Sequence, residues 1–323
     1  MDARSSAAPA AAPKLSAHPL LDALIETARQ QAADHPPALG LVYPCDTLAM
    51  EAAYYIAQAG FARPVLVGPK PLIQEAADEA LVDWRVFEII DVNGTAPQVA
   101  QHAATLARDK ALTVLMKGSL HTDELMSAVV SRESGLRGPR RISHTFVFDL
   151  PRYHKLMALT DCVVNIAPDL ATKRDIVGNA VQLLQKALHI AQPKIGIVAA
   201  VETVNPQIPA TLDAQALVEM GREGAWPGVL IEGPFGFDNA FSAEAARIKK
   251  IESAVAGDAD LLVLPDVNAG NMLYKSFVYA AGGECAGVVM GARVPVVLTS
   301  RSDSTHARLA SAALGSLAIQ AIE

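Results

Sequence analysis

The sequence lacks the features that mark membrane-spanning and nucleic-acid-binding chains. Aromatic residues make up only 5% of its 323 residues, so Ala, Val, Leu and Ile must fill the core. The net charge is −7, which argues against a broad surface for nucleic acid. Apolar runs such as residues 112–116 and 261–264 are too short to span a bilayer. We therefore expect a globular chain with neither a membrane nor a nucleic-acid partner.

Cysteine is also scarce. Cys45, Cys162 and Cys285 are far apart, form no CxxC pair and have no histidine nearby in a ligand pattern. An odd count without a secretory signal is typical of the reducing cytoplasm, and a structural zinc site is not expected. Residues 1–17 are rich in Ala, Pro and Ser but lack the apolar core of a signal peptide, so we interpret them as a disordered lead.

Several catalytic motifs are missing as well. There is no GxGxxG opening a βαβ unit, no GxxxxGK[ST], no GxSxG and no HExxH. These absences disfavour hydride transfer on a Rossmann domain, nucleotide hydrolysis, ester hydrolysis and zinc proteolysis.

What the sequence does contain is an alternation of apolar runs and amphipathic stretches, which predicts an α/β fold with a largely parallel sheet. The runs are apolar throughout, as expected for strands with helices on both faces. A strand that ends at Asp149 before Pro151 marks the best seam, so we expect two doubly wound lobes with a cleft between them. Expected strands are residues 39–43, 65–68, 86–91, 112–116, 142–148, 162–166, 195–200, 228–231, 261–264, 286–290 and 294–298. Expected helices include residues 46–58, 96–109, 172–190, 212–222, 243–256 and 307–321.

Ligands in open α/β sheets bind beyond the carboxyl ends of strands, and residues 294–306 offer the richest such end. Arg301 has the forked guanidinium that suits a phosphate or an acyl-phosphate oxygen. Ser300 could donate to a developing oxyanion, and Asp303 could act as a base. Asp303 or Ser304 could instead be an ordinary helix N-cap beside a surface arginine.

Two further strand ends carry candidate binding residues. After residues 261–264, Asn268 and Asn271 offer amide groups, and Lys275 lies one turn beyond Asn271 on the same helix face. A plain turn with a cap would not need so many polar groups. Lys117 follows another buried strand and could meet a phosphate, or could be a lysine that snorkels at a strand end.

Two charged segments are more ambiguous. Glu232 and Asp238 could bind a metal, although carboxylates in loops are usually solvated or cap helices. Lys173 and Arg174 lie at a predicted helix start, where cations oppose the helix dipole unless an anion is present. The second segment is a mild indication of a phosphate ligand.

With these segments in view, the sequence resembles the phosphate acetyltransferase/phosphate butyryltransferase family from about Pro19 to the C-terminus. The resemblance rests on five segments in the family's order, and their amino-acid sequences are closer to the butyryltransferase-like branch. They are PDVNAGNMLYKS (265–276), VPVVLTSRSDS (294–304), IEGPFGFDNA (231–240), AVETVNPQIPAT (200–211) and LMKGSLHT (115–122).

The resemblance implies two lobes of the isopropylmalate-dehydrogenase type, with residues 304–323 returning to a first lobe of residues 18–149. The second lobe, residues 150–303, would supply the homodimer contact and much of the active site. The implied reaction converts acyl-CoA and inorganic phosphate to acyl phosphate and CoA, reversibly, by direct attack of the CoA thiolate. Coenzyme A is then a substrate, with no permanently bound cofactor and no metal.

Ser300 and Arg301 match the family's catalytic Ser-Arg pair. The position at the family's aspartate spacing is Ala307 here, so Asp303 is our substitute as the base. The acetyltransferase branch also has an arginine soon after the segment matching KGSLHT. None occurs here before Arg132, so Lys117 or Arg141 is expected to bind the phosphate.

Two other functions stay open on the sequence alone. One is a metal- and NAD(P)-dependent decarboxylating dehydrogenase on the same fold, which would need a compact set of acidic ligands. The other is a two-lobed protein that binds an anion without chemistry. Dependence on Mg²⁺ or Mn²⁺ would favour the first, and tight binding without turnover would favour the second.

Overall fold

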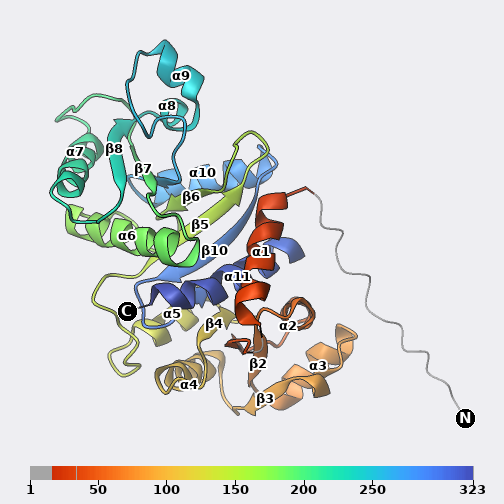
Figure 1. Cartoon of the computed structure of the whole chain (residues 1–323). Coiled ribbons are helices and arrows are strands. Elements are labelled where there is room, and N and C mark those ends of the chain that lie inside the picture. Colours follow the sequence, from red (N-terminus) through yellow and green to blue (C-terminus); the bar gives the residue numbers. More distant parts are fainter. Residues whose placement is uncertain (1–16, 34, 323) are drawn as a thin grey trace, which may run out of the picture.

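A computed structural model describes residues 17–33 and 35–322, so almost all of the expected N-terminal lead lies outside the described residues. The chain forms one 11-stranded sheet covered by helices, as Figure 1 shows. This confirms the predicted α/β fold. The strands are β1 (Ala38–Val42), β2 (Arg63–Gly68), β3 (Glu88–Asp91), β4 (Val114–Lys117), β5 (Ser143–Asp149), β6 (Met157–Thr160), β7 (Lys194–Val198), β8 (Leu230–Phe235), β9 (Leu261–Val263), β10 (Glu284–Met290) and β11 (Val296–Val297).

The helices occupy the connections between these strands. They are α1 (Pro19–Ala32), α2 (Thr47–Ala59), α3 (Lys70–Glu79), α4 (Ala96–Arg108), α5 (Thr122–Val130), α6 (Leu170–Gln182), α7 (Pro209–Arg222), α8 (Phe237–Phe241), α9 (Ala243–Ile248), α10 (Val267–Tyr279) and α11 (Thr305–Ala318). A π-helical turn, Leu183–Ala187, extends α6, and 3-10 turns occur at Trp84–Val86 and Ile319–Ala321.

The sheet has the strand order β3-β2-β1-β4-β11-β10-β5-β6-β9-β7-β8. On one side, β3, β2, β1, β4 and β11 are parallel to one another. On the other side, β6, β9, β7 and β8 are also mutually parallel. Between them, β10 runs antiparallel to both β11 and β5, and β5 runs antiparallel to β6. The parallel sets therefore point their carboxyl ends toward opposite edges of the sheet.

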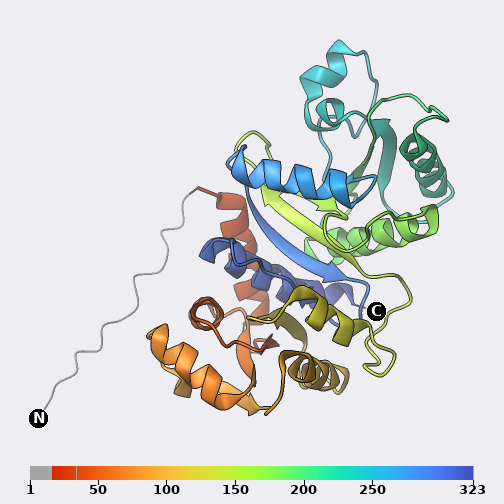
Figure 2. The ribbon, with the colours of Figure 1, turned by 180° about the vertical axis from the view of Figure 1, so that it is seen from behind.

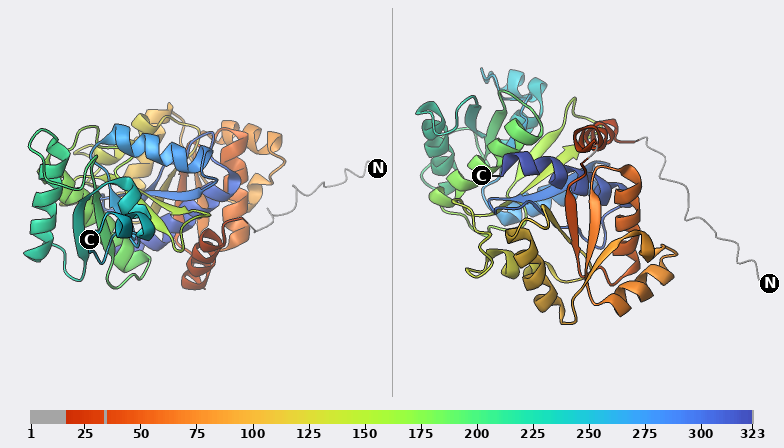
Figure 3. Two further views of the ribbon diagram at one scale, coloured as in Figure 1. Left: turned by 90° about the horizontal axis from the view of Figure 1, so that it is seen from above. Right: turned by 60° about the horizontal axis from the view of Figure 1, so that its bottom comes forward.

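Alternation along β10 shows how the two faces are covered. Residues 286, 288 and 290 belong to a core shared with α1, α2, α6, α7 and α11. Cys285 and Val289 face the other way, into cores shared with α10 and with α4 and α5. We call this second side, covered by α4, α5, α8 and α10, the α10 face. Figures 1 and 2 show the two faces in turn, and the left view of Figure 3 shows α10 and α1 on opposite sides.

The end of the chain returns to its beginning. Helix α11 packs against α1, α2 and β10. His306 Nε2 on α11 lies 2.8 Å from Asp22 Oδ1 on α1, and the Leu20 amide donates to Asp149 Oδ2 at 2.7 Å. Because the sheet is continuous from β3 to β8, the exact lobe boundaries stay a prediction.

Two elements differ from the sequence expectation. The strand expected at 162–166 is β6, Met157–Thr160, followed by a turn. The Asp161 carboxylate accepts bonds from the amides of Val163, Val164 and Asn165, which removes those donors from any strand ladder. The helix expected over 243–256 ends at Ile248 because Lys250 takes a left-handed φ of 56°, which a right-handed helix does not allow.

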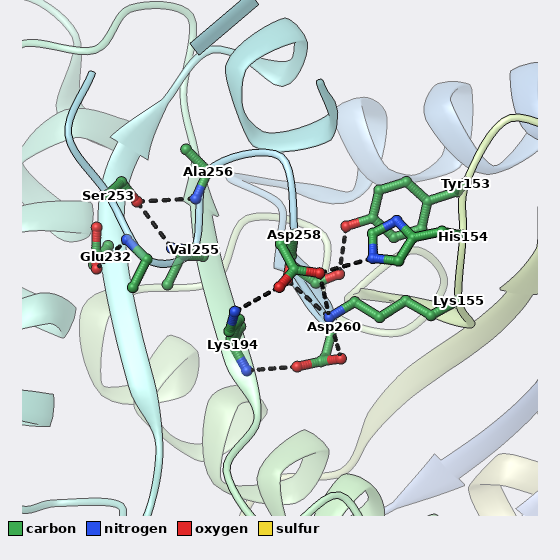
Figure 4. A network of polar contacts seen from close by, with 12 residues as sticks. Tyr153, His154, Lys155, Lys194, Glu232, Ser253, Val255, Ala256, Asp258 and Asp260 are labelled. Atoms are coloured by element: carbon green, nitrogen blue, oxygen red, sulfur yellow. Dashed lines mark hydrogen bonds and ion pairs between the residues drawn. The ribbon is translucent and has the colours of Figure 1, made fainter. Parts of the chain in front are cut away.

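A charge network joins three elements at the edge where β6, β7 and β9 begin, as Figure 4 shows. Lys194 Nζ lies 2.5 Å from Asp258 Oδ2, and Lys155 Nζ lies 2.7 Å from Asp260 Oδ1. His154 Nε2 lies 2.8 Å from Asp258 Oδ1. Burial acts to raise the pKa of Asp258, but hydrogen bonds from Lys194, Lys155 and His154 outweigh it and hold that pKa well below its usual range.

This depressed pKa predicts an acid-sensitive contribution to stability. A carboxyl whose folded pKa is lowered stabilises the fold above its unfolded pKa of about 3.9, and the contribution disappears as the pH falls through the folded value. Because the Asp258 side chain is 38% exposed, solvent screening limits the effect. We expect Asp258→Asn to lower the free energy of unfolding by about 1 kcal/mol at pH 7.

Urea unfolding at pH 7 and pH 3 measures this difference, which should shrink at pH 3. Glu219→Gln, which alters an exposed pair with Arg222 (3.5 Å), is the matched control and should leave stability unchanged. If Asp258→Asn and the parent chain have equal free energies of unfolding at pH 7, the charge network does not stabilise the fold.

Candidate active site

The ends of β4 and β11 bring Lys117 against the loop of residues 299–303. The two strands are parallel and pair Met116 with Val297, so their carboxyl ends lie at the same edge of the sheet. Thr299 Oγ1 lies 3.5 Å from the Lys117 carbonyl oxygen. Lys117 Nζ donates to the carbonyl oxygens of Gly118 and Leu120, each at 3.2 Å, which holds the half-buried ammonium at the strand end.

The loop of residues 300–303 is held by its own polar groups and by one arginine. Asp303 Oδ2 accepts from the Ser300 amide at 2.6 Å, and the Ser300 and Ser302 hydroxyls lie 3.0 Å apart. Arg308 Nη2 donates to the Ser300 carbonyl at 2.7 Å. Ser304, not Asp303, is the N-cap of α11: its hydroxyl accepts from the Ala307 amide at 2.9 Å and donates to Glu284 at 2.6 Å.

The sequence analysis did not identify Arg308 as a site residue, although a cation in an otherwise uncharged helix could have indicated it. The residue is 8% exposed, and it is the one cation in a helix built mainly of Ala, Leu and Ser. A charged residue on an apolar helix is buried only when a partner compensates for its desolvation. Here the partner is the backbone of the loop that precedes the helix.

Arg308 and Lys117 lie near Asp303, and Arg301 precedes it by two residues in the same loop. Burial lowers the pKa of Lys117, and the nearby charges of Arg308 and Arg301 lower it further. Burial raises the pKa of the Asp303 carboxyl, while the Ser300 amide bond and the Arg308 charge oppose that rise. In the described part of the chain, no hydrogen-bond acceptor holds the exposed Arg301 guanidinium. The arrangement can bind an anion and hold a carboxylate whose proton affinity is raised.

Helix α10 borders this region on the α10 face. Asp266 caps it by accepting from the amides of Asn268 and Ala269. Asn271 Nδ2 approaches the Cys162 carbonyl at 3.4 Å. The Tyr274 ring stacks on Phe146 of β5, with centroids 4.3 Å apart and planes 9° apart. Burial raises the pKa of Tyr274, and the charge of Asp303 raises it further.

The predicted site residues therefore fall into three groups. Lys117, Ser300, Arg301 and Asp303 meet where β4 and β11 end. Asn268, Asn271 and Lys275 lie along α10, with Asn268 and Lys275 exposed to solvent.

Arg141 lies in a different place, beside the far end of β10. Glu284, which binds the helix cap Ser304, pairs with Asp149, whereas Met290 pairs with Ser143, two residues after Arg141. Six residues of strand span about 20 Å, so Arg141 and Arg301 do not contact the same phosphate group. Arg141 lines a pocket of about 620 Å³ together with Arg137, Arg140 and Asn165.

The remaining charged segments have partners within the chain. Lys173 is buried and its Nζ lies 2.6 Å from Asp213 Oδ2, so this cation at the start of α6 does not require an external anion. Asp238 pairs with Lys249 at 3.0 Å, and Glu232 accepts from the Ala254 amide at 3.3 Å. Among residues 17–33 and 35–322 no group of three or more His, Cys, Asp or Glu side chains could hold a metal ion. In the same residues no helix is both long and apolar enough to cross a membrane.

Comparisons with known proteins show the family of the chain. The family model described as phosphate acetyl/butaryl transferase matches residues 98–315. A phosphate acetyltransferase of Rhizobium meliloti is 46% identical over 297 residues, which cover 92% of this chain and 92% of that protein. A probable phosphate butyryltransferase of Bacillus subtilis is 42% identical, with 78% of this chain and 83% of that protein covered.

Solved structures show the same relationship. The crystal structure of a branched-chain phosphotransacylase from Enterococcus faecalis has a TM-score of 0.77 and 28% identity, and it covers 88% of this chain and 99% of that chain. A 4-hydroxythreonine-4-phosphate dehydrogenase from Klebsiella pneumoniae has a TM-score of 0.53 at 13% identity, covering 87% of this chain and 98% of that one. This second likeness shows the fold alone. The chain belongs to the phosphate acetyl/butaryl transferase family, a family of acyltransferases.

Proposed function

We propose that this chain transfers a short acyl group, acetyl or butyryl, between coenzyme A and inorganic phosphate. In one direction acyl phosphate and CoA give acyl-CoA and phosphate, and the reaction is reversible. The observation that supports this most directly is the group of cations, Lys117, Arg301 and Arg308, around Ser300 and Asp303. Such a group suits a substrate that carries a phosphate beside a carbonyl.

In the proposed mechanism both substrates bind together and the CoA thiolate attacks the carbonyl carbon of acyl phosphate. The new C–S bond forms a tetrahedral intermediate, whose collapse breaks the C–O bond and releases phosphate. A free thiol with a pKa near 8.5 is only a few per cent ionised at pH 7, so a base is useful. Asp303 would accept the thiol proton, helped by the raised pKa of its carboxyl.

Arg301 and Ser300 would stabilise the charge that develops on the carbonyl oxygen. Donors placed before the reaction act without further reorganisation, especially at a partly buried site. Lys117 would hold the phosphoryl group as a point charge beside them. Arg308 bonds to the loop backbone, so its role in the proposal is to position Ser300 and Asp303.

The other predicted residues would bind the rest of CoA. Asn268, Asn271 and Lys275 lie on the helix that borders the loop region. Arg141, about 20 Å away along β10, would meet phosphate groups of the nucleotide end rather than the reacting phosphate. The proposal needs no resident cofactor or metal, and it includes a homodimer in the cytoplasm, as the family resemblance implies.

Arg301→Ala tests the oxyanion role. Loss of one such donor costs roughly 10²–10³ in rate, so we expect a decrease of that size in kcat. The assay mixes protein, CoA and either acetyl phosphate or butyryl phosphate, and follows thioester absorbance in the ultraviolet. Arg222→Ala, an exposed arginine on α7, is the control and should retain full activity.

Near-normal turnover of folded Arg301→Ala would remove Arg301 from the mechanism. If the parent chain, shown to be folded, formed no thioester from either donor, the acyltransferase proposal itself would fail. Tight binding of acyl phosphate without turnover would then favour a non-catalytic anion-binding protein.

Asp303→Asn tests the base through the pH profile. A base must be deprotonated, so kcat/KM of the parent should fall as the pH drops through the raised pKa of Asp303. We expect the variant to lose about 10²–10⁴ in rate and to lack that acidic limb. An unchanged acidic limb in Asp303→Asn would show that another group is the base, even if the rate is lower.

A further inference from the structure

The α10 face has an apolar floor next to the proposed reaction centre. Residues two apart on a strand share a face, so Lys117 lies on the same side as Leu115, whose core includes α4 and α5. On β5 the same side carries His144, Phe146 and Phe148. The lysine of the site and the aromatic residues of β5 therefore belong to one continuous surface of the sheet.

Gly287 on β10 shapes this floor. It pairs directly with Phe146, and residues directly opposite in an antiparallel pair place their side chains on the same face. A Cβ at position 287 would lie 2.8 Å from His144 Cε1 and 3.0 Å from Phe146 Cε1. The missing side chain thus leaves room for both rings to lean across β10 toward β11.

Tyr274 of α10 covers part of this apolar floor, because its ring stacks on Phe146. The two rings are parallel and 4.3 Å apart, and Phe146 also packs 4.3 Å from the His144 ring. Phe146 is only 9% exposed. Burial lowers the pKa of His144 to about 4, so its ring is neutral at pH 7 and the lining carries no charge there. Such a lining suits a hydrocarbon group.

The stack also lies within reach of the reaction centre. Ser304 Oγ bonds to Glu284, the first residue of β10, whose side chain is on the opposite face of the sheet. The next residue, Cys285, is on the α10 face, and it lies two residues, or about 7 Å, from Gly287, which pairs with Phe146. The charge of Asp303 acts on the Tyr274 hydroxyl, which places the other ring of the stack close to the loop as well.

We propose that Phe146 and Tyr274 form the end wall of the acyl site and restrict transfer to the two-carbon acetyl group. This inference rests on the proposed acyltransferase function. An acetyl methyl would contact the edge of the stack, whereas the two additional carbons of a butyryl chain would have to displace packed rings. Displacing a well-packed side chain is costly because interiors have little free volume.

Phe146→Ala tests the wall by removing the inner ring. The quantity to measure is the ratio of kcat/KM for butyryl phosphate to that for acetyl phosphate. Both values come from one preparation, so the ratio does not depend on the fraction of protein that is folded. One methylene changes discrimination by roughly 10–200-fold, so two should raise the ratio at least about tenfold in the variant.

Two controls separate the wall from general packing. Tyr274→Phe keeps the stack and removes only the hydroxyl, so its ratio should equal that of the parent. Phe241→Leu changes a ring that packs against Tyr153 and Phe277 in the same aromatic cluster, and its ratio should also stay unchanged. If Phe146→Ala does not fold, Phe146→Leu is expected to shift the ratio in the same direction by a smaller factor.

Two results would overturn the inference while leaving acyl transfer intact. One is a parent enzyme that uses butyryl phosphate as well as acetyl phosphate. The other is a folded, active Phe146→Ala or Phe146→Leu variant whose ratio matches the parent. Absence of transfer from both donors in the parent is a different outcome, because it contradicts the proposed function as well.

Discussion

The antiparallel strand β10 is the constraint on which the arrangement of the site depends. It pairs with β5 along its whole length and with β11 near its end, so it joins the two parallel sets of strands into one sheet. Its first residue, Glu284, binds the N-cap of α11, and Gly287 leaves space for the rings of β5. A single strand thus fixes the position of the loop at 299–303 relative to the aromatic floor.

The site also shows how an acidic chain can build a basic pocket. The net charge is −7, yet Lys117, Arg301 and Arg308 gather around one half-buried carboxyl. Lys117 comes from a strand end, Arg301 from a loop and Arg308 from a helix. Because each cation is attached to a different element, their mutual repulsion is balanced by the packing of those elements and by Asp303.

The sequence was sufficient to predict the α/β fold and the cluster of Lys117, Ser300, Arg301 and Asp303. These residues directly follow apolar strands, and parallel strands bring such ends together. Arg308 was marked only by its charge within an apolar helix, and neither its partner nor the Phe146–Tyr274 stack could be predicted from the sequence. Their significance comes from contacts between segments far apart in sequence, such as β5 with α10, and no local pattern encodes the register that brings them together.

The failed local predictions have equally specific causes. The apolar run at 162–166 has the composition of a strand, but the Asp161 side chain binds the amides that a strand would use. Arg141 was expected to bind phosphate, as an alternative to Lys117, because no arginine occurs between the KGSLHT segment and Arg132. That role stays a prediction. The pairing of β5 with β10 places Arg141 at the opposite end of the sheet.

The contact between His306 and Asp22 has a consequence for how the protein is made. Helix α11, which positions the loop through Arg308, packs on the first helix of the fold, α1. A ribosome releases the chain from its N-terminus at about 5–20 residues per second, so α1 has no α11 to pack against until the 284 residues that separate Asp22 from His306 have been synthesised. The reactive loop therefore takes its final shape only after α11 has been made, and a chain that stops before α11 carries no assembled site.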